Sequence, residues 1–232
     1  DGQILEIATA GPGYAIDEPP HALGRELLIP PEERLPSGRD NAAIVSAVHP
    51  EPVPVITPDM HLQGIHHISA ITDRLEQVGA FYEEALGLKL VKKTYNQDDG
   101  QTKHYFWADY DGQSVSPHSS LTLFDWSGST LRERPGIGQT HHIAFRAESA
   151  EQQLEWREHL VGLGVDVSPV MERTYFESIY FRAPDGLLLE IATDGPGFSV
   201  DEDETELGTH LKLPEWLETQ RSSIAASLAP LP

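Results

Sequence analysis

Two histidine pairs and one glutamate are the residues of this chain whose types and spacing could support metal chemistry. His66-His67 and His141-His142 each begin a strand-like run, and Glu190 stands inside another, strongly apolar one. Strand side chains alternate between the two faces of a sheet, so one histidine of each pair can face the same side as the glutamate. A buried carboxylate needs a charged partner, hydrogen bonds or a metal. Two imidazoles and a carboxylate would form the facial triad that binds Fe(II), although each pair could also be one structural and one surface histidine.

The elements that must position these residues follow the order β-α-β-β-β twice. After each histidine pair, apolar residues recur at helical spacing, and three strand-like runs follow. We expect helices over 74–86 and 150–163, each ended by a glycine, Gly87 or Gly164. We expect strands over 89–95, 104–107 and 120–124 in the first half, and over 165–171, 175–182 and 187–192 in the second.

A longer repeat relates the beginning of the chain to its later part. Residues 1–14, DGQILEIATAGPGY, align without a gap on residues 185–198, DGLLLEIATDGPGF, with ten identities. The repeat predicts four parts: 1–33 as the tail of a preceding, truncated copy of the domain, 34–60 as a proline-rich linker, 61–217 as a complete bimodular domain with modules at about 61–130 and 135–200, and 218–232 as a C-terminal helix or tail. Glu6 matches Glu190, and it belongs to a second site only if histidines from elsewhere complete one.

The composition excludes several classes of function. The 37 acidic and 16 basic residues give a formal charge of −21, which nucleic acids and anionic membranes would repel. No cysteine is present, so thiolate metal sites and cysteine nucleophiles are excluded. We expect a cytoplasmic protein, since no apolar run could span a bilayer and no signal peptide is visible. The spread of the acidic residues favours adaptation to a salt-rich cytoplasm over ordinary acidity.

Three segments of the sequence resemble a known protein family. The segments GIHHISAI, QTHHIAFR and ERTYFESIYFRAPDGLLLEIATDGPGF resemble the vicinal oxygen chelate superfamily of glyoxalases, bleomycin resistance proteins and extradiol dioxygenases. The sequence is most similar to the branch of dioxygenases that cleave the rings of hydroquinones and catechols. The resemblance covers 61–217 in full and 1–33 as a partial copy. It implies an α+β fold in which paired βαβββ modules form a curved mixed sheet around a metal site.

The resemblance also implies roles for single residues. It assigns His67, His142 and Glu190 as metal ligands, with Fe(II) expected and Mn(II) or another divalent metal as the alternative.

Around that metal, the resemblance implies a second group of residues. His66 and His141 would support the ligands or contact the substrate, and either could transfer a proton. Tyr180 matches an active-site tyrosine of the branch, and Arg173 matches an arginine near the substrate. Ser69 lies on the same strand face as the metal-binding histidine of its module. Tyr180 could instead be a core tyrosine, and Arg173 a surface charge.

The number of ligands separates an oxygenase from an isomerase. Glyoxalase-type isomerases of this superfamily use a fourth protein ligand, on the last strand of the first module. Aligning 121–124 on 187–190 puts Phe124 there, and Phe124 cannot bind a metal; Asp125 points to the other face unless a bulge intervenes. We therefore expect a ring-cleaving dioxygenase that takes an aromatic substrate and dioxygen, as a homodimer or larger homo-oligomer. The alternatives are a Zn(II) or Ni(II) isomerase or lyase, and a non-catalytic small-molecule-binding protein.

Overall fold

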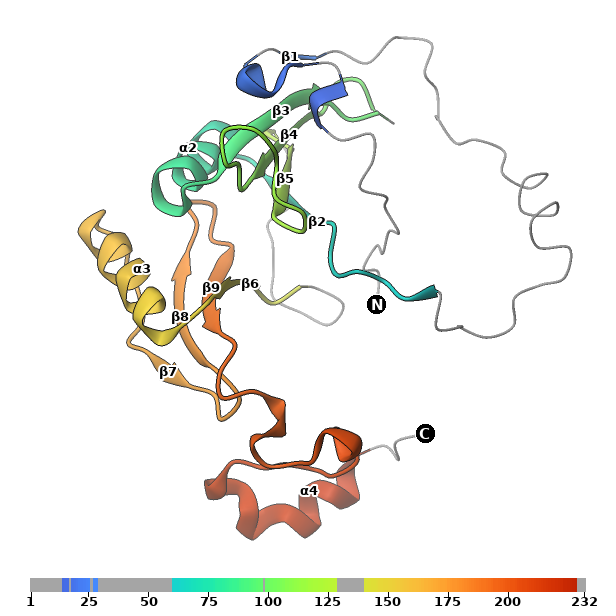
Figure 1. Cartoon of the computed structure of the whole chain (residues 1–232), viewed down its shortest axis with the longest axis vertical. Helices are drawn as coiled ribbons and strands as arrows, with labels where there is room; N and C mark the ends of the chain where they lie inside the picture. Colours follow the sequence, from blue (N-terminus) through green and yellow to red (C-terminus); the bar gives the residue numbers. More distant parts are fainter. Residues whose placement is uncertain are drawn as a thin grey trace, which may run out of the picture. The chain divides into compact units, whose positions relative to one another are not determined.

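The computed structural model describes residues 14–16, 18–25, 27–28, 60–97, 99–128 and 140–228 (Figure 1). The chain divides into two compact units. The first runs to Ile143 and includes Arg182–Leu189, and the second consists of Ala144–Phe181 and the residues from Glu190 onward. Glu6 and nearly all of the expected linker lie outside the described residues.

The first unit is built on a five-stranded mixed sheet. Its strands β2 (His67–Thr72), β3 (Lys89–Tyr95), β4 (Lys103–Ala108) and β5 (Ser120–Asp125) are joined by β1 (Leu27–Leu28), in the order β1-β3-β4-β5-β2. The β2–β5 and β1–β3 pairs are parallel, and the other two are antiparallel. The parallel β2–β5 pair requires a crossover, and helix α2 (Leu75–Leu86) begins it directly after β2.

Helix α2 supplies much of the core of this unit. Its buried face includes Val78 and Tyr82, whose ring meets that of Trp107 on β4 edge to face at 5.8 Å. Gly79 lets the indole approach the helix, since a Cβ atom there would lie 2.5 Å from Trp107 Cζ2. The helix ends at Gly87, whose φ of 67° is the left-handed conformation expected of a terminating glycine.

The second module has the same element order. Strand β6 (Ile143–Ala147) leads into helix α3 (Ala150–Gly162), followed by β7 (Met171–Glu172), β8 (Glu177–Arg182) and β9 (Leu188–Thr193). The four strands form a sheet in the order β6-β9-β8-β7. Gln153, a buried residue of α3, donates hydrogen bonds of 2.8 Å to the backbone oxygens of Glu177 and Ile191, which ties the helix to β8 and β9.

The structure confirms the α+β class and the two βαβββ modules, and it corrects one strand. The strand expected over 165–171 is reduced to β7, because Pro169 has no N–H for a strand ladder and Ser168 Oγ bonds the Pro169 carbonyl oxygen. The strands of each module form a sheet of their own, as the paired βαβββ modules predict.

After β9 the chain forms short helical segments. Three 3-10 turns, Phe198–Val200, Glu204–Glu206 and Glu215–Gln220, precede helix α4 (Arg221–Ser227). Similar turns before β1 cover Tyr14–Ile16 and Pro20–Ala22. In the described part of the chain, no helix combines the length and the apolar character that a membrane crossing requires.

Candidate functional site

Glu190 is a buried carboxylate held by two hydroxyl groups. It is the third residue of β9 and only 2% exposed. Ser178 and Tyr180, two residues apart on β8 and thus on the same face, both donate to Glu190 Oε1, the tyrosine at 3.1 Å. Because a buried carboxylate is costly without donors, these hydroxyls explain how the apolar strand tolerates it.

Arg173 extends this arrangement to a third side chain. Its Nε atom donates to the Tyr180 hydroxyl at 3.2 Å, and its guanidinium carbon lies 5.1 Å from the centre of the tyrosine ring. Arg173 is exposed while Tyr180 is half-buried. Three of the predicted site residues, Arg173, Tyr180 and Glu190, therefore form one hydrogen-bonded chain from the surface to a buried carboxylate.

The two histidine pairs have the same local geometry. The Nδ1 atoms of His66 and His67 lie 2.9 Å apart, and those of His141 and His142 lie 2.8 Å apart. In both pairs the rings meet at 86° with their centres slightly more than 5 Å apart. Strand β2 begins at His67 and β6 begins after His142, so the first histidine of each pair lies before its strand. In each pair, therefore, the histidine that precedes the strand contacts Nδ1 of the next histidine through its own Nδ1.

Ser69 belongs to a second hydrogen-bonded chain in the first unit. The Thr122 hydroxyl donates to Ser69 Oγ at 2.8 Å, and His104 Nε2 lies 2.8 Å from the same threonine oxygen. Since the threonine proton is used toward Ser69, His104 must be the donor to Thr122. The His104 ring stacks on Phe124 with 3.8 Å between ring centres. Burial, and then repulsion from His67, lower the pKa of His104 from 6.5 to about 4, so this imidazole is neutral at pH 7.

The hydrogen bonds also show which residue of β5 corresponds to Glu190. His104, second in β4, bonds to Thr122, third in β5, just as Ser178, second in β8, bonds to Glu190, third in β9. Thr122, and not Phe124, therefore stands at the position of the fourth ligand. The two-residue shift keeps the same strand face, and a threonine supplies neither a carboxylate nor an amide.

The predicted ligands belong to different units. His67 and His142 lie in the first unit, and Glu190 lies in the second. Within the residues that the structure describes, no group of three histidine, aspartate or glutamate side chains is placed to hold a metal ion. The metal triad remains a prediction.

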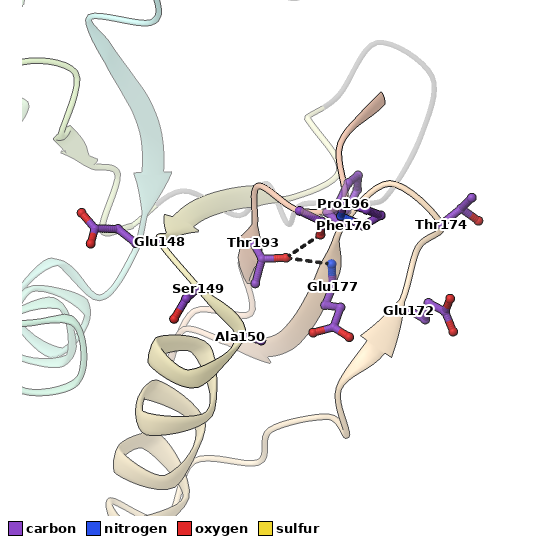
Figure 2. Close-up of a pocket in the computed structure, with 10 residues that line it drawn as sticks. Glu148, Ser149, Ala150, Glu172, Thr174, Phe176, Glu177, Thr193 and Pro196 are labelled. Atoms are coloured by element: carbon purple, nitrogen blue, oxygen red, sulfur yellow. Dashed lines mark hydrogen bonds between the residues drawn. The ribbon is translucent and has the colours of Figure 1, made fainter. Parts of the chain in front are cut away.

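A pocket is also present in the second unit, and Glu172 and Thr174, the chain neighbours of Arg173, form part of its lining. It has a volume of about 380 Å³ and lies beside the N-terminus of α3, where Glu148, Glu172 and Glu177 contribute to its lining (Figure 2). The Thr193 hydroxyl accepts a hydrogen bond from the Glu177 backbone N–H at 3.0 Å and donates to the Gly195 carbonyl oxygen at 3.1 Å. No predicted site residue lines this pocket, and its three carboxylates disfavour an anionic ligand.

Sequence reasoning missed three residues of these networks. Ser178 precedes Tyr180 by two positions in a strand, so alternation alone would have placed both hydroxyls on one face. His104 and Thr122 give only a weak signal, because their pairing depends on the register of β4 against β5. Register is fixed by backbone hydrogen bonds between segments that are distant in sequence.

Comparison with known proteins connects the chain to dioxygenases. It is 46% identical to MhqA of Bacillus subtilis strain 168 over 100 residues, 43% of this chain and 32% of the relative. It is 34% identical to MhqO of the same strain over 175 residues, 75% of this chain and 52% of the relative. Both are provisionally named ring-cleaving dioxygenases. It is 30% identical to a chlorohydroquinone/hydroquinone 1,2-dioxygenase of Sphingobium indicum over 181 residues, 75% of this chain and 52% of the relative. The chain spans about half the length of these relatives or less.

Solved structures resemble the chain as well. A glyoxylase/bleomycin resistance protein/dioxygenase domain from Frankia sp. EAN1pec has a TM-score of 0.48 and 24% identity, covering 60% of this chain and 97% of that one. Residues 64–191, more than half of the chain and nearly all of both βαβββ modules, match the sequence profile of one family. The chain belongs to the Glyoxalase/Bleomycin resistance protein/Dioxygenase superfamily.

Proposed function

We propose that this chain is an Fe(II)-dependent, ring-cleaving dioxygenase of the extradiol type, acting on a dihydroxylated aromatic compound such as a hydroquinone or a catechol. The observation that carries the proposal is the chain of hydrogen bonds from Arg173 through Tyr180 to the buried Glu190. It places the guanidinium and the phenol beside the carboxylate. Such an arrangement can bind the hydroxyl oxygen of an aromatic substrate next to a metal held by that carboxylate. The names of the relatives support the same reaction class.

His67, His142 and Glu190 would hold the metal, which we propose to be Fe(II), with Mn(II) or another divalent ion as the alternative. The donor set fits, since the chain has no cysteine and two imidazoles with one carboxylate suit ferrous iron. Such an ion, when bound, supplies open coordination positions for the aromatic diol and dioxygen. The neighbouring histidines engage Nδ1 of His67 and His142, so Nε2 would be the metal-binding atom of each.

Tyr180 and Arg173 would act on the substrate oxygen. A tyrosine has one hydroxyl proton, which goes to Glu190 in the structure. When a metal engages that carboxylate, the same proton can be donated to a phenolic oxygen of the substrate. Arg173, which donates to the tyrosine oxygen, would then stabilise the negative charge that develops beside it.

The remaining predicted residues would handle protons and orientation. His66 or His141 would carry a proton from the ring hydroxyl toward solvent. Ser69 would offer its hydroxyl on the same face of β2 as His67. We further propose a cytoplasmic protein that works as a homo-oligomer.

The test is anaerobic reconstitution with Fe(II), followed by hydroquinone or catechol in oxygenated buffer. We expect stoichiometric oxygen consumption and a yellow ring-fission product. Glu190→Gln should abolish both and lower the iron content, whereas Glu172→Gln, which alters an exposed carboxylate on β7, should leave both unchanged. Activity on a glutathione hemithioacetal without oxygen uptake would point to the isomerase instead. An unchanged iron content in both His67→Ala and Glu190→Gln would refute the ligand set.

A further inference from the structure

The chain contains one backbone motif twice, at residues 14–25 and 198–209. Each copy has two 3-10 turns separated by three residues, and each has a glycine in the left-handed conformation, Gly24 (φ 70°) and Gly208 (φ 77°). In each copy the glycine N–H donates to a glutamate carboxylate six residues earlier, Glu18 at 3.2 Å and Glu202 at 3.4 Å. The sequence repeat therefore encodes a repeated local structure.

The first copy is packed onto the sheet of the first unit. Leu23 is 2% exposed and forms a core cluster with Val91 of β3 and Ala108 of β4. Glu18 Oε2 accepts a 2.7 Å hydrogen bond from Lys92 Nζ, an ion pair with less than a tenth of either side chain exposed. Burying both charges is tolerable only because they are paired, so this contact is specific.

The backbone and a tyrosine complete this contact. The Tyr14 hydroxyl donates to Ser120 Oγ at 2.9 Å. Farther along the same segment, Leu27 and Leu28 form β1 and pair in parallel with Lys93 and Thr94 of β3. This segment, residues 14–28, is called the first tail. It binds by adding a strand to the sheet edge at β3 and by burying Leu23 against Val91 and Ala108.

The second copy has similar side chains at the matching positions, and its apolar ones are exposed. Phe198 and Leu207, which match Tyr14 and Leu23, are 65% and 43% exposed. Glu202 lies 3.3 Å from the exposed His210, where Glu18 has a buried lysine. Leu211 and Lys212 match the two residues of β1, yet they form no strand. Apolar side chains that are buried in one copy of a motif and exposed in the other indicate a missing partner surface.

We propose that residues 198–213 bind the β3–β4 surface of a second copy of this chain, in the manner of residues 14–28, with Glu202 paired to Lys92 of that copy. The β3–β4 surface has the lysine, the apolar residues Val91 and Ala108, and the strand edge that this motif fits. Residues 14–28 occupy the surface in their own chain, so binding of the second tail is an exchange between two equivalent segments. Exchange of a segment between two copies of a chain is a low-cost route to dimers.

The chain has no cysteine, so the pairing can be tested by introduced disulfides. Leu27 pairs with Lys93, so Leu211, its equivalent, should pair with Lys93 of the other copy. We would mix the full-length variants Lys93→Cys and Leu211→Cys under mild oxidation, each with its own mass label. We expect a mixed disulfide with about twice the 25.6 kDa mass of one chain. Glu215→Cys, beyond the repeated segment, replaces Leu211→Cys in the control.

A matched pair of substitutions tests the exchange itself. Glu18→Gln weakens the first tail and frees the surface, so it should raise the dimer fraction measured by light scattering. Glu202→Gln weakens the competing tail and should lower that fraction. A merely structural role would change stability in both variants but would not move the dimer fraction in opposite directions.

Two results would overturn the proposal. One is a mixed disulfide with Leu211→Cys that is no more abundant than with Glu215→Cys. The other is a shift of the dimer fraction in the same direction in Glu18→Gln and Glu202→Gln.

Discussion

Arg173 contacts Tyr180 in two ways, by a 3.2 Å hydrogen bond to the hydroxyl and by a guanidinium that lies 5.1 Å from the ring centre. The tyrosine in turn donates to Glu190. The phenol is therefore fixed from both sides, and its orientation does not depend on a substrate being present. Preorganised donors of this kind stabilise developing negative charge most effectively.

Tyr180→Phe removes the hydroxyl and keeps the ring. We expect kcat for ring cleavage to fall by about 10²-fold, the usual effect of losing one preorganised donor, with iron content unchanged. Steady-state oxygen uptake by the reconstituted protein measures this kcat. Tyr175→Phe is the matched control, because that hydroxyl donates to the Asp201 carboxylate at 3.4 Å and not to Glu190. Equal activity in the two variants would remove Tyr180 from the reaction.

Arg173→Lys separates charge from geometry. Lysine keeps the cation but lacks the planar Nε–H donor and stacks less well on a ring. We expect a smaller loss of kcat than in Tyr180→Phe, and a larger loss in Arg173→Met, which has no charge. If Arg173→Met retained full activity, the guanidinium would be only a surface charge, the alternative reading of this residue.

Two helical glycines should respond to alanine in opposite directions. Gly79→Ala in α2 would place a Cβ atom 2.5 Å from the Trp107 ring, and we expect it to lower the free energy of unfolding by about 1–3 kcal/mol. Gly162→Ala, at the end of α3, meets no atom within 4 Å and should raise it by about 0.5–1 kcal/mol. Urea denaturation measures both. A stabilising Gly79→Ala would contradict the packing of α2 against β4.

His104 should make the metal-free protein less stable in acid. Its pKa is about 4 in the folded state, below the value of about 6.5 for an unperturbed histidine. Between these values the unfolded chain binds the additional proton, so this stabilisation is fully present above pH 6.5 and is lost as the pH falls toward 4. In chelator, Tm measured from pH 7 to pH 4 should fall less steeply in His104→Gln than in the parent. His159→Gln, at an exposed site on α3, should leave the parent slope unchanged.

The charge of −21 predicts stabilisation by salt. Carboxylates repel one another over the Debye length, which shrinks from about 10 Å at 0.1 M to about 3 Å at 1 M salt. Tm should therefore rise with KCl, and matched concentrations of a neutral osmolyte should produce a smaller rise. A Tm that stays flat or falls with KCl would favour the ordinary acidic protein over adaptation to a salt-rich cytoplasm.

The sequence predicted elements well where local signals decide them. Helical spacing and Gly87 predict the end of α2, and the strand-like run over 89–95 matches the observed bounds of β3. The expected strand over 165–171 is wrong because Pro169 has no N–H to contribute to a strand ladder. Glu190 and Tyr180 were predicted on adjacent strands, as observed. The correspondence of Thr122 to Glu190 could not be predicted from the sequence. Moving the alignment of β5 by two residues keeps the same strand face, so only the pairing of β5 with β4 identifies the matching residue.

The pairing of Leu27 with Lys93 has a consequence for the order of events on the ribosome. The partner of β1 is synthesised 66 residues later, so the first tail waits roughly 3–13 s at ordinary elongation rates before its binding surface exists. The second tail, which we propose binds this surface on another copy, is made after β3 and β4 are complete, so the first tail has had time to occupy the surface of its own chain. Slower translation between residues 28 and 93 lengthens the wait, whereas slower translation between β4 and residue 198 favours the first tail. Under the proposed exchange, the timing of synthesis would then set how often a newly made chain leaves its β3–β4 surface free for another copy.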